Sequence, residues 1–280
     1  VIDGRKLNVI PGFIDGHIQG GYGVDVMDGT EDALRILAGN LPKEGTTSFL
    51  ATTITESEEK ITNALMNIAN YKCKAGEAEL IGIHLEGPFI NRVKAGAQPF
   101  EYIIPPSIEK FKKWQALSNN KIKTVTLAPE CDEDGSFIRF LVDAGVNVSA
   151  GHTNVGFSRM KRAYLHGVRQ VTHLCNAMTQ IHHRDIGVVG AAFLLNEIRG
   201  ELIADCIHIA PEMLQLIYDN MGSERIILIT DAMRAKGLED GEYELGSQTV
   251  YVKGNRATLK DGTLAGSVLK MNDAAKQMLK

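Results

Sequence analysis

Six residues that can bind a metal ion or move a proton recur along this chain, each close to the end of a short apolar run. They are His17, Glu86, His152, His173, His208 and Asp231. Imidazole and carboxylate groups are the ligands that Zn²⁺ and Fe²⁺ take from proteins, and they are also common general acids and bases. A single buried histidine is more often a hydrogen-bonded core residue. Six such residues in equivalent positions indicate a metal-dependent active site.

Glu86 ends the apolar run LIGIHLEGP, where an ionised carboxylate is costly unless it is paired or bound to a cation. With His152 and His173 it makes a set of two imidazoles and one carboxylate, which suits Zn²⁺ or Fe²⁺ and leaves a position open for water. We therefore predict one divalent metal per chain, held by these three residues. Asp231 closes another apolar run, RIILITDA, and is predicted to be the catalytic acid and base.

The stretch PGFIDGHIQGG carries His17 and Gln19 two residues apart, where a pair of histidines would bind a cation together. Residues i and i+2 of a strand point to the same face, so both side chains are expected to line the site. Glutamine is a neutral amide and a weaker ligand than imidazole for Zn²⁺ or Fe²⁺. At most, the pair is expected to hold a second cation weakly.

The remaining histidines give weaker signals. His84 lies two residues before Glu86 and is interpreted as structural. His182 and His183 belong to the segment QIHHRDIG, where loop histidines are common but the adjacent Arg184 makes an anion site conceivable.

Short β-branched runs alternate with amphipathic stretches along most of the chain, which fixes the elements that must position these residues. Eight βα units in series predict a (β/α)8 barrel, whose active site lies at the C-terminal ends of the strands. The candidate strands are 12–18, 46–54, 80–87, 123–129, 147–153, 170–177, 202–208 and 225–232, and the helical patterns are 31–41, 56–72, 107–117, 136–145, 156–167 and 211–221.

The pattern changes after the eighth strand, where residues 241–267 alternate apolar and polar side chains around the turn signals KGN and KDG. This predicts a β-hairpin or meander. Residues 236–264 are expected to be an excursion of a small β domain, to which residues 1–10 also belong. The barrel then takes residues 11–235 and 265–280, the last of these as a helix.

Composition excludes several classes of function. The formal charge of −4 over 280 residues, without a cluster of lysines and arginines, favours a small-molecule substrate over a nucleic acid or an anionic membrane. No apolar run approaches the roughly 18 residues of a membrane span. The four cysteines are scattered without a C-x-x-C pair, which favours reduced thiols in a cytoplasmic protein.

Eight segments, in this order, resemble the N-acetylglucosamine-6-phosphate deacetylases of the amidohydrolase superfamily. They are PGFIDGHIQGGYGVDVMD, HLEGPFI, KAGAQP, SAGHTN, THLCNAM, LIADCIH, TDAMRAKG and DGTLAGS. The resemblance runs from about residue 9 to the C-terminus. It implies a (β/α)8 barrel with a small β-sandwich built from the two chain ends. It also implies hydrolysis of N-acetylglucosamine 6-phosphate to glucosamine 6-phosphate and acetate, in amino-sugar catabolism and cell-wall recycling.

The resemblance assigns roles to individual residues. It implies metal binding by Glu86, His152 and His173, acid/base catalysis by Asp231, and stabilisation of a substrate oxygen by His208. Arg184 is expected to contact the phosphate of the substrate in a neighbouring subunit, which implies a homodimer. Substrate contacts are further expected at Ala97, Asn176, Ala177, His208, Leu264, Ala265 and Gly266.

Three alternatives remain at this point. Another amidohydrolase, acting on a different N-acyl or cyclic amide, often bridges two metals with a lysine after the fourth strand, but here that strand ends in LAPE. A barrel that only binds phosphosugars has no use for a base such as Asp231 beside a metal. A metal-independent isomerase would leave Glu86, His152 and His173 unexplained.

Overall fold

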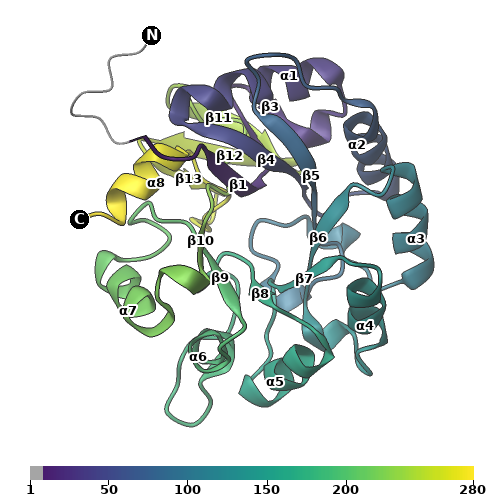
Figure 1. The fold of residues 1–280 in the computed structure, drawn as a ribbon, viewed down its shortest axis with the longest axis vertical. Coiled ribbons are helices and arrows are strands. Elements are labelled where there is room, and N and C mark those ends of the chain that lie inside the picture. Colours follow the sequence, from purple (N-terminus) through teal and green to yellow (C-terminus); the bar gives the residue numbers. More distant parts are fainter. Residues whose placement is uncertain (1–8) are drawn as a thin grey trace.

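The computed structural model describes residues 9–280, and eight parallel strands form its centre (Figure 1). Their order is β1-β4-β5-β6-β7-β8-β9-β10, so each strand pairs with the next one along the chain. The predicted (β/α)8 architecture is confirmed. The strands are β1 (Phe13–Ile18), β4 (Thr46–Thr53), β5 (Glu79–Glu86), β6 (Ile122–Leu127), β7 (Asn147–Ala150), β8 (Gln170–Val171), β9 (Arg199–Leu202) and β10 (Ile226–Leu228).

The barrel closes where β1 meets the segment that follows β10. Ile18 and Ala232 form a parallel bridge, and the backbone N–H of Asp231 donates to the carbonyl of His17 at 2.9 Å. Beneath this contact, buried Asp15 accepts hydrogen bonds from the hydroxyl of Thr230 at 2.5 Å and from its backbone N–H at 3.2 Å. Closure therefore brings the first and last barrel segments, and the candidate residues that they carry, side by side.

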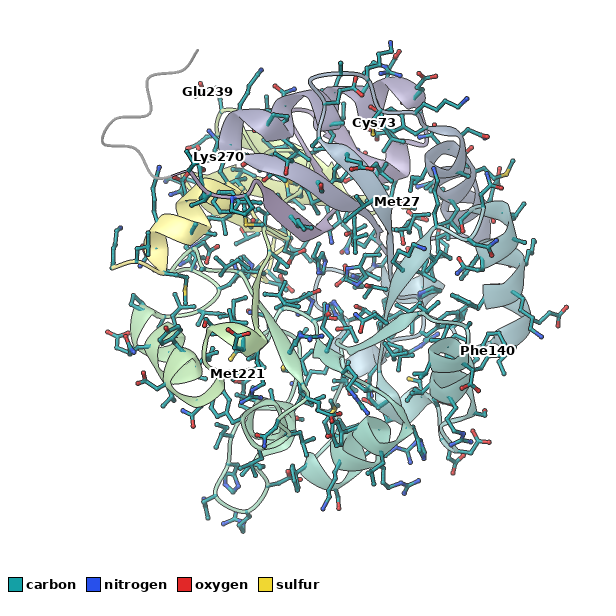
Figure 2. The ribbon with its side chains drawn as sticks, in the orientation of Figure 1. Met27, Cys73, Phe140, Met221, Glu239 and Lys270 are labelled. Carbon is teal, nitrogen blue, oxygen red and sulfur yellow. The ribbon has the colours of Figure 1, made fainter. Side chains whose placement is uncertain are left out.

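A ring of helices surrounds the strands (Figure 1). Thr30, Ser57 and Ser107 cap the first three main helices, since each side chain accepts a hydrogen bond from a backbone N–H in the first turn. In Figure 2, Phe140 of α4 and Met221 of α7 mark this outer ring, and side chains fill its centre. The helices are α1 (Glu31–Asn40), α2 (Glu58–Asn70), α3 (Ile108–Leu117), α4 (Ser136–Asp143), α5 (Phe157–His166), α6 (Gly187–Leu194), α7 (Pro211–Met221) and α8 (Met271–Gln277).

Short elements complete the described chain. The 3-10 turns are η1 (Val26–Asp28), η2 (Leu41–Glu44), η3 (Arg92–Lys94), η4 (Phe100–Tyr102), η5 (Pro129–Cys131) and η6 (Ser223–Arg225), and a two-stranded ribbon joins β2 (Gly20–Gly21) to β3 (Val24–Asp25).

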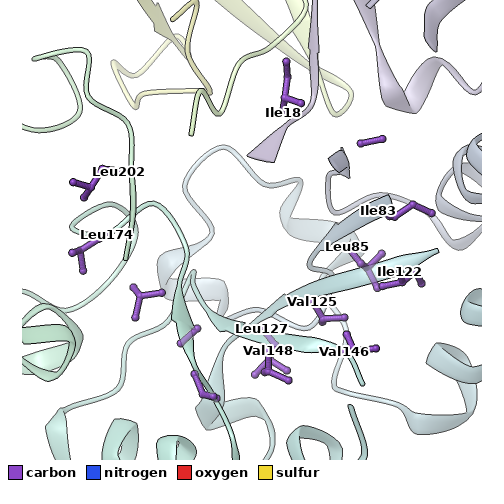
Figure 3. Close-up of a cluster of buried hydrophobic side chains, with 14 of the residues drawn as sticks. Ile18, Ile83, Leu85, Ile122, Val125, Leu127, Val146, Val148, Leu174 and Leu202 are labelled. Atoms are coloured by element: carbon purple, nitrogen blue, oxygen red, sulfur yellow. The ribbon is translucent and has the colours of Figure 1, made fainter. Parts of the chain in front are cut away.

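The hydrophobic core lies between the strands and the helices. Ile83 and Leu85 of β5 are fully buried among apolar side chains of neighbouring strands, such as Val125 (Figure 3). Successive residues of a strand point to opposite faces, so His84 and Glu86 face the interior of the barrel instead. The same alternation that builds the core therefore directs polar residues toward the barrel axis.

A three-stranded antiparallel sheet follows the barrel strands, which is the meander of the two predicted forms. It consists of β11 (Gly241–Leu245), β12 (Gln248–Lys253) and β13 (Arg256–Thr258). Its buried residues Leu245, Val250 and Ala257 form a second core cluster with Ile54 and Met233 of the barrel. Residues 1–8 of the predicted small-domain remnant lie outside the described residues, and the domain boundaries stay a prediction.

Four strands end three or more residues earlier than predicted, and one helix was not predicted. The strands expected at 147–153, 170–177, 202–208 and 225–232 end at Ala150, Val171, Leu202 and Leu228. The residues beyond them form turns that carry side chains into the site. The missed helix, α6, reads GVVGAAFL and is buried on most of its sides, so it lacks the alternation of apolar and polar faces that reveals an amphipathic helix.

Among residues 9–280 no helix is long and apolar enough to cross a membrane. The cysteines Cys73, Cys131, Cys175 and Cys206 are all free thiols.

Candidate active site

The three predicted metal ligands meet at the C-terminal end of the barrel. Glu86 Oε1 lies 3.1 Å from His152 Nε2 and 3.2 Å from His173 Nε2, and the two Nε2 atoms are 3.1 Å apart. All three side chains are buried. The structure thus brings together residues that lie up to 87 positions apart in the chain.

The protonation of both imidazoles follows from their outer contacts. His152 Nδ1 faces the carbonyl oxygen of Lys94 at 2.8 Å, and His173 Nδ1 faces that of Asn176 at 3.1 Å. A carbonyl only accepts hydrogen bonds, so each Nδ1 carries a hydrogen and each neutral ring directs the lone pair of Nε2 inward. Two lone pairs and a carboxylate oxygen therefore converge on one point, and a divalent cation fits this donor set.

The backbone at these positions takes a conformation that the sequence did not reveal. His152, His173 and Asp231 have φ values of 49°, 32° and 50°, in the left-handed region that non-glycine residues adopt rarely. Such residues cost about 1–3 kcal/mol each and persist only when their surroundings hold them. The carbonyls of His152 and Asp231 accept backbone hydrogen bonds from Asn91 at 2.9 Å and from Ser267 at 2.8 Å. The turns thereby aim the side chains inward.

His17 and Gln19 adjoin the metal ligands, as their spacing predicted. His17 Nε2 lies 3.3 Å from Glu86 Oε2 and 3.2 Å from Asp231 Oδ1. Gln19 Nε2 donates to Glu86 Oε2 at 3.0 Å, whereas Gln19 Oε1 is buried without a hydrogen-bond partner in residues 9–280. Gln19 therefore offers a donor to the carboxylate where a histidine would offer a lone pair to a second cation.

Glu201 of β9 is a buried member of the cluster that the sequence analysis missed. Its Oε2 lies 3.0 Å from His17 Nδ1, and its Oε1 accepts from Gln170 Nε2 at 2.6 Å. Burial alone would raise the pKa of Glu201, but the neighbouring His17 brings it below its usual value. Arg199 and Glu197 shortly precede Glu201 in the segment EIRGELI, so no apolar run marked this carboxylate in the sequence.

Charge is balanced within this buried cluster. Burial opposes the charged form of Glu86, but the charge of the neighbouring His17 brings its pKa well below the usual value. Burial likewise opposes protonation of His17, yet Glu86, Asp231 and Glu201 raise its pKa well above the usual value. A positive charge is therefore stabilised in the midst of three carboxylates.

His84 occupies the structural position that was expected. It is fully buried, and its Nε2 lies 2.6 Å from the hydroxyl of Thr126, which in turn contacts Thr172 at 2.6 Å. Burial and the nearby His17 lower the pKa of His84 to about 4. The residue is thus a neutral part of the polar layer beneath the site.

A pocket of about 370 Å³ opens above the cluster. Most of the predicted site residues line it: Gln19, Glu86, Ala97, His152, His173, Asn176, Ala177, His208, Asp231, Leu264 and Gly266. Further lining residues that were not predicted include Ile54, Val93, Lys94, Gly96, Gln98, Leu245 and Thr263.

Three predicted site residues do not line this pocket. His17 is fully buried beneath it. Ala265 is also fully buried, and its backbone N–H donates to the carbonyl of Ala257 at 3.1 Å, which holds the turn that presents Leu264 and Gly266. Arg184 lies in an exposed loop, where its Nη1 contacts His183 Nε2 at 2.7 Å.

His208 reaches the pocket from a loop and not from a strand end. β9 ends at Leu202, because Asp205 turns the backbone by accepting hydrogen bonds from the N–H groups of Ile207 and His208, both at 2.8 Å. The other carboxylate oxygen of Asp205 lies 2.7 Å from His208 Nδ1. The sequence analysis placed Asp205 inside a strand and gave it no role.

Comparisons with known proteins agree with this site. The family model "Amidohydrolase family" matches residues 8–275. An N-acetylglucosamine-6-phosphate deacetylase of Bacillus subtilis is 50% identical over 274 residues, which cover 96% of this chain and 69% of the relative.

Two solved structures share the fold. One, an N-acetylglucosamine-6-phosphate deacetylase from Thermotoga maritima, matches with a TM-score of 0.88 and 37% identity, covering 96% of this chain and 72% of that one. A second, from Mycobacterium smegmatis in complex with N-acetyl-D-glucosamine-6-phosphate, matches with a TM-score of 0.91 and 31% identity, covering 96% and 70%. The chain therefore belongs to the amidohydrolase family, within the group of N-acetylglucosamine-6-phosphate deacetylases.

Proposed function

We propose that this chain hydrolyses the acetamide of N-acetyl-D-glucosamine 6-phosphate to glucosamine 6-phosphate and acetate. The observation that carries the proposal is the convergence of Glu86 Oε1 with the Nε2 atoms of His152 and His173, with Asp231 in the same pocket. The names of the similar proteins supply the substrate. A cation held by Glu86, His152 and His173, with Zn²⁺ or Fe²⁺ preferred by these ligands, would lower the pKa of a bound water and polarise the substrate carbonyl.

Asp231 moves the proton. One of its oxygens lies 3.2 Å from His17 Nε2, and its side chain is 11% exposed, so it adjoins the ligand cluster and remains open to the pocket. Its carboxylate accepts a proton from the attacking water and then gives this proton to the nitrogen of the leaving amine. His208, on the pocket wall, holds the carbonyl oxygen or a sugar hydroxyl as charge develops.

The remaining roles follow the shape of the pocket. Asn176 and Ala177 on one side, and Leu264 with Gly266 on the other, bound the space for the sugar. Arg184 lies outside this pocket and reads the phosphate of the substrate in the partner subunit of a homodimer. Residues 236–264 belong to a small β domain, and the enzyme acts in the cytoplasm on the sugars of amino-sugar catabolism.

One metal ion per chain is the expected stoichiometry. Gln19 Nε2 donates to Glu86 Oε2, which a second cation would need as a ligand. Elemental analysis of purified protein, supplemented with Zn²⁺ or Fe²⁺ and then dialysed, should give close to one ion per chain. The Gln19→His variant offers an imidazole in place of the amide and should raise this number. Two tightly held ions in the unaltered protein, or none after supplementation, would contradict the assignment.

Release of acetate and glucosamine 6-phosphate tests the reaction itself. The metal-supplemented protein is incubated with N-acetylglucosamine 6-phosphate, with its C4 epimer and with unphosphorylated N-acetylglucosamine. Efficient turnover of the first compound supports the proposal. Turnover only of other N-acyl or cyclic amides would support a different amidohydrolase, and tight binding without acetate release would indicate a phosphosugar-binding barrel.

A further inference from the structure

Asp205 pairs with His208 on the pocket wall and takes no part in the proposed proton transfer. Their side chains are only 6% and 7% exposed, for His208 and Asp205 respectively, and the atoms His208 Nδ1 and Asp205 Oδ2 are 2.7 Å apart. The pair lies in the turn after β9, where Cys206 has a φ of 60°. A short contact between buried groups, held on a strained turn, indicates a built arrangement.

The two oxygens of Asp205 have different tasks. Oδ1 accepts the backbone N–H groups of Ile207 and His208, both at 2.8 Å, and so fixes the turn. Oδ2 faces the ring and accepts a hydrogen from His208 Nδ1. Burial by itself would raise the pKa of Asp205, but its hydrogen bonds with the ring and backbone of His208 bring the pKa below the usual value. An ionised Asp205 has no hydrogen of its own to donate to the ring.

We propose that Asp205 is a positioning residue that holds the hydrogen of neutral His208 on Nδ1 and turns Nε2 toward the substrate. This inference rests on the proposed function only for the identity of the substrate. The hydrogen bond between His208 and Asp205 does not depend on that function. Because Nδ1 is engaged, Nε2 is the only ring nitrogen that remains for the pocket. The neutral ring then offers the substrate an acceptor, and the protonated ring offers a donor in the same place.

Other charged groups surround the pair. On the pocket side of His208 lie Lys94 and the polar cluster of Glu86, His152, His173 and Asp231. Behind Asp205, a second hollow is lined by Lys270, Asp273, Lys276 and Lys280, from α8 and the segments flanking it. Among these described residues, Asp205 is the one with a recorded side-chain hydrogen bond to a ring nitrogen of His208. The tautomer therefore depends on Asp205.

Asp205→Asn tests the assignment because the turn fixes the orientation of the new amide group. The two backbone N–H groups require an acceptor, so the amide oxygen of Asn takes the place of Oδ1 and its NH₂ group faces the ring. The ring must then accept at Nδ1 and carry its hydrogen on Nε2. The ¹⁵N spectrum of histidine-labelled, zinc-loaded protein distinguishes these two tautomers, and the signals missing from His208→Gln identify His208. The expected result is an exchange of tautomer between wild type and Asp205→Asn.

Kinetics provide the second measurement. Asp205→Asn should lower kcat/KM for the phosphosugar by at least about tenfold, as loss of an orienting carboxylate does elsewhere. In a His208→Gln background the same substitution should have little further effect, because Asp205 acts through His208. A full additional loss in that background would show that Asp205 only stabilises the turn.

The NMR measurement requires no substrate, so it separates this inference from the proposed function. An unchanged tautomer in Asp205→Asn would overturn the inference even if the protein is an efficient deacetylase. An exchanged tautomer would uphold the positioning role even if acetate release were absent and the proposed function had failed.

Discussion

Asp231 is the residue on which the proposed reaction depends most directly. Asp231→Asn keeps the shape of the side chain and removes its capacity to transfer a proton, so kcat should fall by at least about a hundredfold. The proposed metal ligands Glu86, His152 and His173 are unchanged, so metal content and substrate binding should largely persist. Steady-state kinetics and elemental analysis of the same preparation check both expectations.

Asp219→Asn is the matched control for this variant, because Asp219 is exposed on α7 and contacts only Gln215 among its recorded side-chain partners. It should keep normal kcat. If Asp231→Asn also keeps near-normal kcat, or loses activity only because it has lost its metal, Asp231 is not the acid/base.

A second residue-scale prediction concerns the effect of pH on stability. Burial raises the pKa of Asp25 to about 7, and its Oδ2 is buried without a hydrogen-bond partner in the described chain. In the unfolded chain its pKa is about 3.9. Between these values the folded state holds a proton that the unfolded state releases, so the free energy of unfolding falls as pH rises from about 4 to 7. Asp25→Asn removes this contribution.

Urea denaturation of wild type and Asp25→Asn at about pH 4 and pH 8 measures the contribution of Asp25 to the free energy of unfolding. The variant should gain stability relative to wild type between the two pH values, by a few kcal/mol at most. All other titrating groups are common to both proteins and cancel in the difference. If the free energies of unfolding of wild type and Asp25→Asn differ by the same amount at both pH values, Asp25 does not titrate in this range.

Site residues could be predicted from the sequence where a charged side chain interrupted an apolar run. Glu86 stood out in an apolar run, and the structure places it between His152 and His173. Asp205 gave no such signal, because a carboxylate beside a histidine at i+3 is common in loops. The left-handed backbone of His152, His173 and Asp231 was also unpredictable, since tertiary contacts impose it.

At the scale of elements, periodicity predicted most helices and failed where it was absent. α2 and α4 have buried apolar stripes, and both were predicted within a few residues. α6 is buried on most sides and contains two glycines, so no periodic signal marked it. The predicted strand 202–208 overlaps β9 (Arg199–Leu202) only at Leu202, because the apolar residues that suggested a strand continue into a turn that Asp205 holds.

A buried ion pair ties together η2, α8 and the segment that follows β10. Lys236 Nζ lies 2.6 Å from Glu44 Oε1, and both residues are at most 2% exposed. Glu44 ends η2, and its other oxygen accepts the backbone N–H of Met271, the first residue of α8, at 3.3 Å. Lys236→Met leaves the carboxylate of Glu44 buried without its cation, which should lower the free energy of unfolding by about 3–5 kcal/mol.

The double variant Lys236→Met, Glu44→Gln separates the charge from the packing. Glutamine removes the unpaired charge and keeps an acceptor for the N–H of Met271, so most of the lost stability should return. Urea midpoints of the wild type, both single variants and the double variant complete the cycle. A double variant as unstable as Lys236→Met would show that the lysine side chain stabilises the fold by packing alone.

At the scale of the molecule, a parallel barrel explains how scattered residues form one site. Each βα unit returns the chain to the same end of the barrel, so Glu86 of β5 and Asp231 after β10 meet without any sequence proximity. Once eight βα units were counted in the sequence, this rule predicted that the active site lies at the C-terminal ends of the strands. The proposed contribution of a second subunit does not follow from this rule, because a neighbouring chain leaves no periodic signal in the sequence.

Arg184 connects the single chain to its proposed dimer. The loop around it is ordered: His182 and Asp185 exchange backbone hydrogen bonds of 3.1 Å, and Asp185 Oδ1 accepts the N–H of Phe157 at 2.9 Å. Arg184 is exposed at the tip of this loop and does not line the pocket of its own chain. Arg184→Ala should therefore raise KM for N-acetylglucosamine 6-phosphate far more than for N-acetylglucosamine, which has no phosphate to pair with the guanidinium.

Hybrid dimers decide which subunit Arg184 serves. Co-expression of Arg184→Ala chains and Asp231→Asn chains under two affinity tags yields dimers in which one pocket combines an intact Asp231 with the partner's intact Arg184. Purified hybrids should regain about half of the wild-type activity at low substrate concentration, since one of the two pockets is complete. Arg184→Ala homodimers, assayed in parallel, set the baseline. If Arg184 served its own pocket, neither site of the hybrid would be complete, and activity would stay at that baseline.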